Sequence, residues 1–89
     1  AEIVDAVGDK LDVICEGGIH RGTHMLKALS LGAKACSGGR LYLYALAAGG
    51  QAGVERAIEK YKSELVRDMK LMGCKTISDL NRSNLRFRR

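Results

Sequence analysis

Two short apolar stretches, each ending in a glycine pair, limit what this chain can fold into. The first is Leu11–Cys15, which ends at Glu16-Gly17-Gly18. The second is Ala33–Ser37, which ends at Gly38-Gly39-Arg40. A near-continuous apolar run of this length is typical of a strand buried on both faces, as in a parallel sheet. The sequence therefore predicts two strands of that kind.

Helical patterns separate and follow the two strands. We predict a helix from about Thr23, its N-cap, to Leu31, a short apolar helix over Leu41–Ala48, and a long helix over Ala52–Met72. The apolar stripe of the long helix has spacings of three and four and comprises Val54, Ile58, Tyr61, Leu65, Met69 and Met72. Its charged side, predicted to face water, includes Glu55, Glu59, Lys60 and Glu64.

Shorter signals complete the pattern at the two ends of the chain. Glu2–Val7 has helical character, and Gly8 is a plausible stop. Thr76–Asp79 resembles a capping box that begins one last turn. The alternation of helices and strands favours βαβ units and an α/β fold. Two parallel strands alone leave open edges and uncovered faces, so we expect the chain to be part of a larger α/β protein or to fold against another chain.

Composition excludes several classes of protein. The longest apolar run has eight residues, Leu41–Ala48, whereas a membrane-spanning helix needs about 20. Glu2 and Asp5 stand where a secretory signal would be basic and apolar. The three cysteines are widely spaced and no C-x-x-C pair occurs, so we predict reduced, mostly buried thiols, no metal site and a cytoplasmic location.

The net charge of +5 comes from the end of the chain. Residues 1–81 hold eleven basic and ten acidic side chains, whereas residues 82–89 hold four arginines and no acid. We divide the chain into a folded part, 1–81, and a basic tail, 82–89, that is solvated and poorly ordered. The alternative use of the tail is weak attraction to anionic lipid at the membrane periphery or to a partner. Nucleic acid is not expected, because Phe87 is the only aromatic residue in the tail.

The two glycine pairs also indicate an anion site. Each follows a strand, opens into a helix and is followed closely by basic residues: His20 and Arg21 in one case, Arg40 in the other. Glycines let backbone N–H groups approach an anion, a helix N-terminus supplies unpaired donors, and an arginine adds a bidentate grip. Loops after neighbouring strands would converge on one phosphate. The alternative is two tight turns without a ligand.

The segment E-G-G-I-H-R-G-T-H-M-L-K-A-L-S-L-G-A-K-A-C-S-G-G-R, residues 16–40, resembles the FMN-dependent 2-hydroxy-acid dehydrogenases. That family includes glycolate oxidase, L-lactate dehydrogenase and flavocytochrome b2. Similarity continues through L-A-A-G-G-Q-A-G-V, residues 46–54, and M-G-C-K-T-I, residues 72–77. This sequence differs from the family pattern at five places. Glu16 and His24 replace aspartates, His20 replaces an arginine, Leu41 replaces a proline, and Cys36-Ser37-Gly38 stands where the family favours aliphatic residues.

The resemblance implies a fold, a ligand and partners. The fold is the last two βα units, strands 7 and 8 with their helices, of a (β/α)8 TIM barrel, whose remainder would be a companion segment or chain. The cofactor is FMN, the substrate a small L-2-hydroxy acid, and the assembly a homo-oligomer, a tetramer in related proteins. The cofactor-binding residues implied are Glu16 and Gly17 near the ribityl chain and phosphate, Gly18, His20, Gly39 and Arg40 around the phosphate, and Ile19 and Arg21 beside them.

No catalytic residue can be assigned, because the resemblance places the family's catalytic histidine and substrate-binding arginines before Ala1. By itself the chain is expected to be inactive. Two other functions stay open on the sequence. One is a phosphate-binding barrel fragment of another enzyme class, and the other is a non-enzymatic module that binds through its basic tail.

Overall fold

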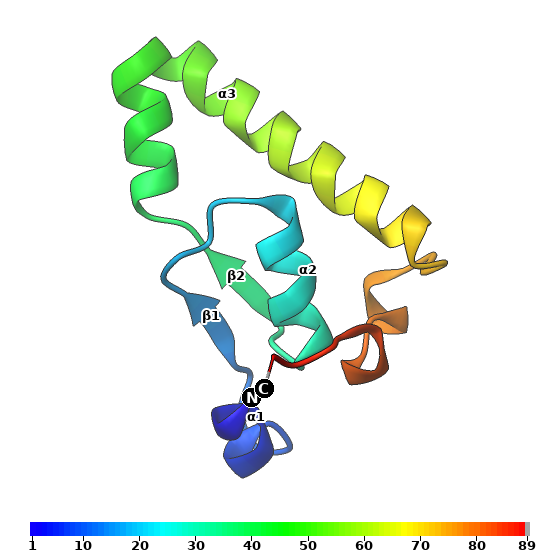
Figure 1. The fold of residues 1–89 in the computed structure, drawn as a ribbon. Coiled ribbons are helices and arrows are strands. Elements are labelled where there is room, and N and C mark those ends of the chain that lie inside the picture. Colours follow the sequence, from blue (N-terminus) through cyan, green and yellow to red (C-terminus); the bar gives the residue numbers. More distant parts are fainter. Residues whose placement is uncertain (89) are drawn as a thin grey trace.

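A computed structural model describes residues 1–88 as an α/β unit. The elements are α1 (Glu2–Val7), β1 (Ile14–Glu16), α2 (Gly22–Ser30), β2 (Ala35–Ser37), α3 (Arg40–Leu71) and two 3-10 turns, η1 (Ile77–Asp79) and η2 (Arg82–Asn84). The strands β1 and β2 lie side by side, α2 packs beside them, and the long arm of α3 passes across α2 (Figure 1). The expected β–α–β unit is therefore present.

The two strands pair in parallel, and both are shorter than predicted. The register aligns Ile14 with Ala35, Cys15 with Cys36 and Glu16 with Ser37. The first strand begins late because the N–H of Leu11 still donates to the Val7 carbonyl, in the turn that follows α1.

Only one face of this sheet is covered in the described residues. Alternate residues of a strand point to opposite faces. The Cys36 thiol faces α2, 4.0 Å from the Met25 carbonyl oxygen, and the aligned Cys15 is also half-buried. On the opposite face Ile14 is 62% exposed. The prediction of strands buried on both faces is thus wrong for this part of the chain taken alone, because nothing in it covers the second face.

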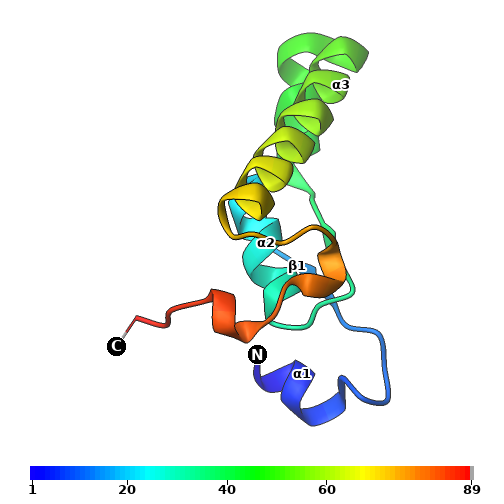
Figure 2. The ribbon, with the colours of Figure 1, turned by 90° about the vertical axis from the view of Figure 1, so that its right-hand side faces the viewer.

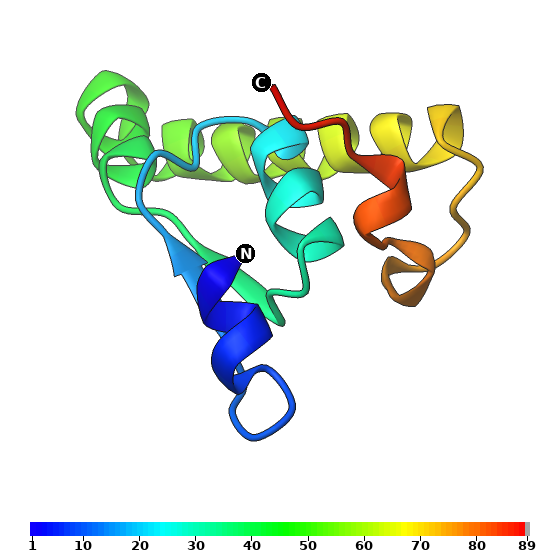
Figure 3. The ribbon, with the colours of Figure 1, turned by 60° about the horizontal axis from the view of Figure 1, so that its bottom comes forward.

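The helix α3 consists of two arms that meet at Gly50. That residue has φ 60° and ψ −144°, which is outside the helical region and which glycine adopts without a Cβ clash. A Cβ at Gly53 would lie 2.2 Å from the Ala45 carbonyl oxygen, so the bend also needs glycine there. The two arms correspond to the two predicted helices, and the sharp bend between them is visible in Figure 1 and Figure 3.

The buried core lies between α2 and the far end of α3. Leu26, Met69 and Leu80 form it, with partly buried apolar side chains around them: Leu29, Leu65, Met72 and Cys74. The predicted stripe of α3 is confirmed in this half. Ile58, in the other half, is 50% exposed. The helix α2 has only nine residues, about 13 Å at 1.5 Å per residue, so it cannot cover the whole arm.

Most of the predicted helix ends are confirmed. Gly8 ends α1, Gly32 and Gly73 follow α2 and α3 with positive φ, and the Thr76–Asp79 capping box is present. The predicted N-cap of α2 was wrong. The N-cap is Arg21, and Thr23 lies inside the helix.

The start of the predicted tail contacts the rest of the chain. Arg82 pairs with Asp5 of α1 at 2.6 Å, at the beginning of η2. Figure 2 shows the tail running away from the helices beyond that turn. Arg89 lies outside the described residues. No helix formed by residues 1–88 combines the length and apolar character needed to cross a bilayer.

Candidate functional site

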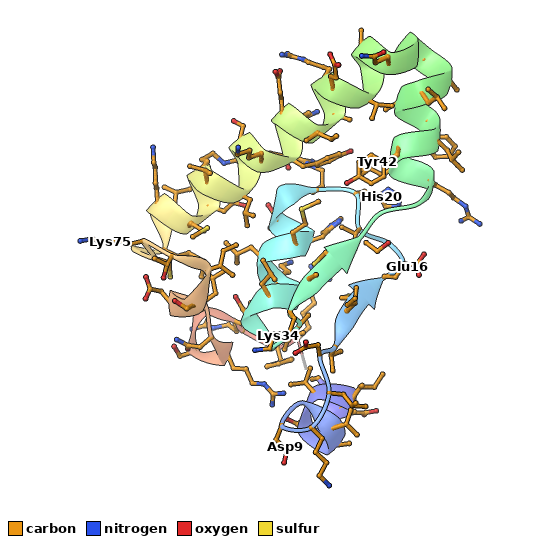
Figure 4. The ribbon with its side chains drawn as sticks, turned by 180° about the vertical axis from the view of Figure 1, so that it is seen from behind. Asp9, Glu16, His20, Lys34, Tyr42 and Lys75 are labelled. Atoms are coloured by element: carbon orange, nitrogen blue, oxygen red, sulfur yellow. The ribbon has the colours of Figure 1, made fainter. Side chains whose placement is uncertain are left out.

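A cleft of about 340 Å³ lies at the carboxyl ends of β1 and β2. Its walls are the loop after β1, the end of β2 and the beginning of α3. The lining residues are Glu16, Gly17, Gly18, Ile19, His20, Ser37, Gly39, Arg40 and Leu41. Figure 4 shows Glu16 and His20 at this end of the sheet, with Lys34 and Asp9 at the opposite end.

Seven of the eight residues predicted to bind a cofactor line this one cleft, and Arg21 does not. Two further residues, Ser37 and Leu41, line it as well. The parallel register explains Ser37, because it stands directly opposite Glu16 at the end of the sheet. An alignment of the two predicted strand ends could have identified it.

The loop after β1 owes its path to glycines and to a histidine. Gly17 and Gly18 have φ values of 92° and 70°, in the region that favours glycine. Ile19 is buried and anchors the loop. The N–H of His20 donates to Nδ1 of His24 at 3.1 Å. His24 thus holds the loop.

The beginning of α3 offers backbone donors to the cleft. Gly39 is the N-cap and has no side chain to satisfy the first turn, which also contains no acidic residue. The first intrahelical bonds run from Tyr42 and Leu43 to the Gly39 carbonyl. The N–H groups of Arg40 and Leu41 therefore have no acceptor within the helix, and the positive end of the helix dipole lies at the cleft.

The beginning of α2 has its own buried carboxylate. Glu64 of α3 is only 5% exposed and accepts hydrogen bonds from Nε of Arg21 at 3.0 Å and from the N–H of Gly22 at 3.0 Å. The prediction that Glu64 faces water was wrong. Helical periodicity alone does not show that a cation and a free N–H from α2 lie opposite this position.

These bonds account for the electrostatics of the pair. The hydrogen bond from Arg21 is the main reason that the pKa of Glu64 lies below its ordinary value, with a further contribution from the Gly22 N–H. The same bond raises the pKa of Arg21. Arg21 bonds to Glu64 and does not line the cleft, whereas Arg40 does line it.

The charge of the cleft is mixed. Arg40 supplies a cation and Glu16 a carboxylate, with His20 in the loop that begins beside Glu16. A phosphate fits the side formed by Arg40 and the α3 N-terminus, where donors and positive charge coincide. A carboxylate repels phosphate but accepts hydrogen bonds from hydroxyl groups. The donor set therefore fits a ligand with a phosphate at one end and a hydroxylated chain beside it.

In residues 1–88 no three His, Cys, Asp or Glu side chains are grouped so as to hold a metal ion. The three cysteines are free and half-buried, less buried than predicted.

The Glu64 pair predicts an acid-sensitive contribution to stability. A carboxyl with a lowered folded-state pKa stabilises the fold fully above its unfolded pKa, ordinarily 4.5, and this stabilisation is lost as the pH falls through the lower folded value. We expect the difference in melting temperature between the complete protein and its Glu64→Gln variant to be constant above about pH 5.5 and to shrink below pH 4.5. Melting curves from pH 3.5 to 7 measure it, and a difference that does not change over this range would contradict the expectation.

Comparison with known proteins gives a consistent result. A family model described as FMN-dependent dehydrogenase matches residues 1–87. The chain is 45% identical over 85 residues to a peroxisomal (S)-2-hydroxy-acid oxidase of Arabidopsis thaliana, with 96% of this chain and 23% of the relative covered. It is 48% identical over 84 residues to an L-lactate oxidase of Nostoc sp., with 94% of this chain and 23% of the relative covered.

A solved structure shows the same arrangement in space. The flavin-binding domain of baker's yeast flavocytochrome b2 superimposes with a TM-score of 0.83 at 43% identity, covering 92% of this chain and 21% of that one. The chain thus spans less than a quarter of the length of these relatives.

Proposed function

The chain belongs to the family of FMN-dependent dehydrogenases, and on that premise we propose that it forms the C-terminal part of an oxidoreductase that converts a lactate-like L-2-hydroxy acid into the 2-oxo acid. The similar proteins are named as oxidases of 2-hydroxy acids and of L-lactate. The observation that supports a cofactor-binding role most directly is the single cleft formed by the two glycine loops and Arg40.

The two strands are proposed to be strands 7 and 8 of a (β/α)8 barrel. Three features support this position: the parallel pairing of β1 and β2, the uncovered sheet face around Ile14, and an anion cleft at the carboxyl ends of both strands. In barrels of this kind, the loops after strands 7 and 8 frequently bind phosphate. The uncovered face would then line the barrel interior, and the remaining strands would be the partner that covers it.

Within the cleft each residue has a proposed task. Arg40 and the N–H groups at the beginning of α3 hold the FMN phosphate, together with the loop at Gly17 and Gly18. Glu16 accepts hydrogen bonds from ribityl hydroxyls, and the neighbouring Ser37 is placed to contact the same part of the ligand. Bound flavin would supply the acceptor for the hydride equivalent that leaves the substrate. The residues described here bind and orient the cofactor, and we assign no catalytic group among them.

The first test is the visible spectrum of the complete protein before and after anaerobic L-lactate. We expect a flavin spectrum that bleaches on addition. A flavin spectrum that stays unbleached would support FMN as the cofactor and exclude L-lactate as the substrate. Absence of any flavin, with no uptake of added FMN, would contradict the proposed cofactor site.

Replacing His20 by arginine is expected to tighten FMN binding. The family pattern has arginine at this position, and a guanidinium near the phosphate is permanently charged and can donate two hydrogen bonds to it, which an imidazole cannot. We expect a gain of about threefold to tenfold in affinity, or about 1 kcal/mol, measured by quenching of FMN fluorescence. Lys34→Arg, at the opposite end of the sheet, is the control. Equal affinity in His20→Arg and its parent would show that residue 20 does not face the phosphate.

A further inference from the structure

A buried charge outside the cleft holds the loop that forms one of its walls. Glu64 is not among the lining residues, yet it bonds both to Arg21, the last residue of the loop, and to Gly22, the first residue of α2. Five residues, 17–21, connect the end of β1 to the beginning of α2. One end of this loop is therefore fixed by the sheet and the other by Glu64.

The contact between the two helices at this point is close. A Cβ on Gly22 would lie 2.6 Å from the Glu64 Cβ and 2.6 Å from the backbone nitrogen of Leu65. At the next residue of α2 and one turn further along α3, the Thr23 hydroxyl donates to Asp68 at 2.5 Å. These bonds join the first residues of α2 to one face of α3. The end of the loop is therefore held against α3.

We propose that Glu64 is a positioning residue for the anion cleft, because its carboxylate fixes the N–H of Gly22 and thereby the path of residues 17–20. This role rests on the proposed FMN function. Two consecutive glycines with positive φ make the loop adaptable, and a loop that is ordered only when the ligand binds lowers affinity by its ordering cost. An acceptor that orders the loop beforehand removes that cost without touching the ligand.

The Glu64 carboxylate also determines which helix N-terminus, that of α2 or that of α3, is free to bind the ligand. Glu64 accepts from the N–H of Gly22 and from Nε of Arg21, two donors that would otherwise attract an anion. At the beginning of α3 no side chain takes that place. The phosphate is thereby directed to α3 and Arg40.

Two neutral variants of similar size separate the hydrogen bond from the charge. Glu64→Gln keeps a carbonyl acceptor for the Gly22 N–H, whereas Glu64→Met fills the space without one. Glu59→Met, at an exposed position on the same helix, is the matched control. The dissociation constant of FMN is measured for the complete proteins by fluorescence quenching, well below the melting temperature of each apoprotein.

We expect Glu64→Met to bind FMN at least tenfold more weakly, Glu64→Gln to stay within about threefold of the parent, and Glu59→Met to match it. A purely structural role would lower only the melting temperature of Glu64→Met and leave its dissociation constant unchanged, which would overturn the proposal. Equal weakening in the Gln and Met variants would overturn it too. A parent that binds no FMN would instead contradict the proposed function.

If Glu64→Met does not fold, Gly22→Ala tests the same contact from the other helix. Its added Cβ must push the beginning of α2 away from Glu64 and Leu65. We expect the folded variant to bind FMN at least tenfold more weakly. Unchanged affinity in that variant would overturn the proposal.

Discussion

Replacing Arg40 by alanine in the complete protein is expected to weaken FMN binding by about 1.5–3 kcal/mol, which is the usual contribution of a hydrogen bond to a charged group. This corresponds to a rise of about one to two orders of magnitude in the dissociation constant. The expectation follows from the position of Arg40 in the cleft, at the uncapped beginning of α3, while Arg21 is paired with Glu64.

Equilibrium titration of the apoprotein with FMN measures this effect, and Arg56→Ala is the matched control, since Arg56 is an exposed arginine of the same helix outside the cleft. Arg40→Lys should recover part of the lost affinity, because it restores the charge but not the bidentate geometry. Equal FMN affinity in Arg40→Ala and the parent would remove the phosphate assignment from this cleft.

Replacing Leu26 by alanine should have the largest effect on stability. Leu26 is 3% exposed and lies in the core with Met69 and Leu80. Truncation of a buried leucine costs about 2–5 kcal/mol, through the lost transfer energy and the cavity that remains. Because this core joins α2 to α3, the loss should promote unfolding of the part of the protein that surrounds the cleft.

Thermal and urea denaturation of the complete protein measure this loss, with Lys27→Ala, an exposed neighbour on α2, as the control. We expect a clearly lower melting temperature for Leu26→Ala and a change within about 0.5 kcal/mol for Lys27→Ala. FMN binding measured well below the melting temperature should change far less than in Arg40→Ala. Parent-like stability of Leu26→Ala would show that this core does not hold the two helices together.

Local patterns were sufficient for the elements of the fold and for most of the cleft. Glycines ended helices where a positive φ was needed, as at Gly32 and Gly73, because that preference depends on the residue itself. The two glycine loops were placed together correctly because parallel strands bring their carboxyl ends to the same edge. Seven of eight predicted residues consequently line one cleft.

Features that depend on a partner distant in sequence were not predicted. Thr23 is a residue type favoured at N-caps, but its hydroxyl donates to Asp68, which lies 45 residues further along the chain. The contact between His20 and His24 likewise depends on the turn of the loop, which brings the His20 N–H to the His24 ring. Glu64 lies on the charged side by periodicity, but the close approach permitted by Gly22 buries it.

The sequence alone was enough to predict the order of helices and strands, the glycine loops that follow both strands, and the family whose ligand is FMN. These depend on backbone preference, hydrophobic period and motif, all of which are local along the chain. Sequence patterns did not show which arginine lines the cleft and which is paired elsewhere. That choice depends on packing α2 against α3, which sets a carboxylate 43 residues away in sequence opposite Arg21 and leaves the beginning of α3 uncapped.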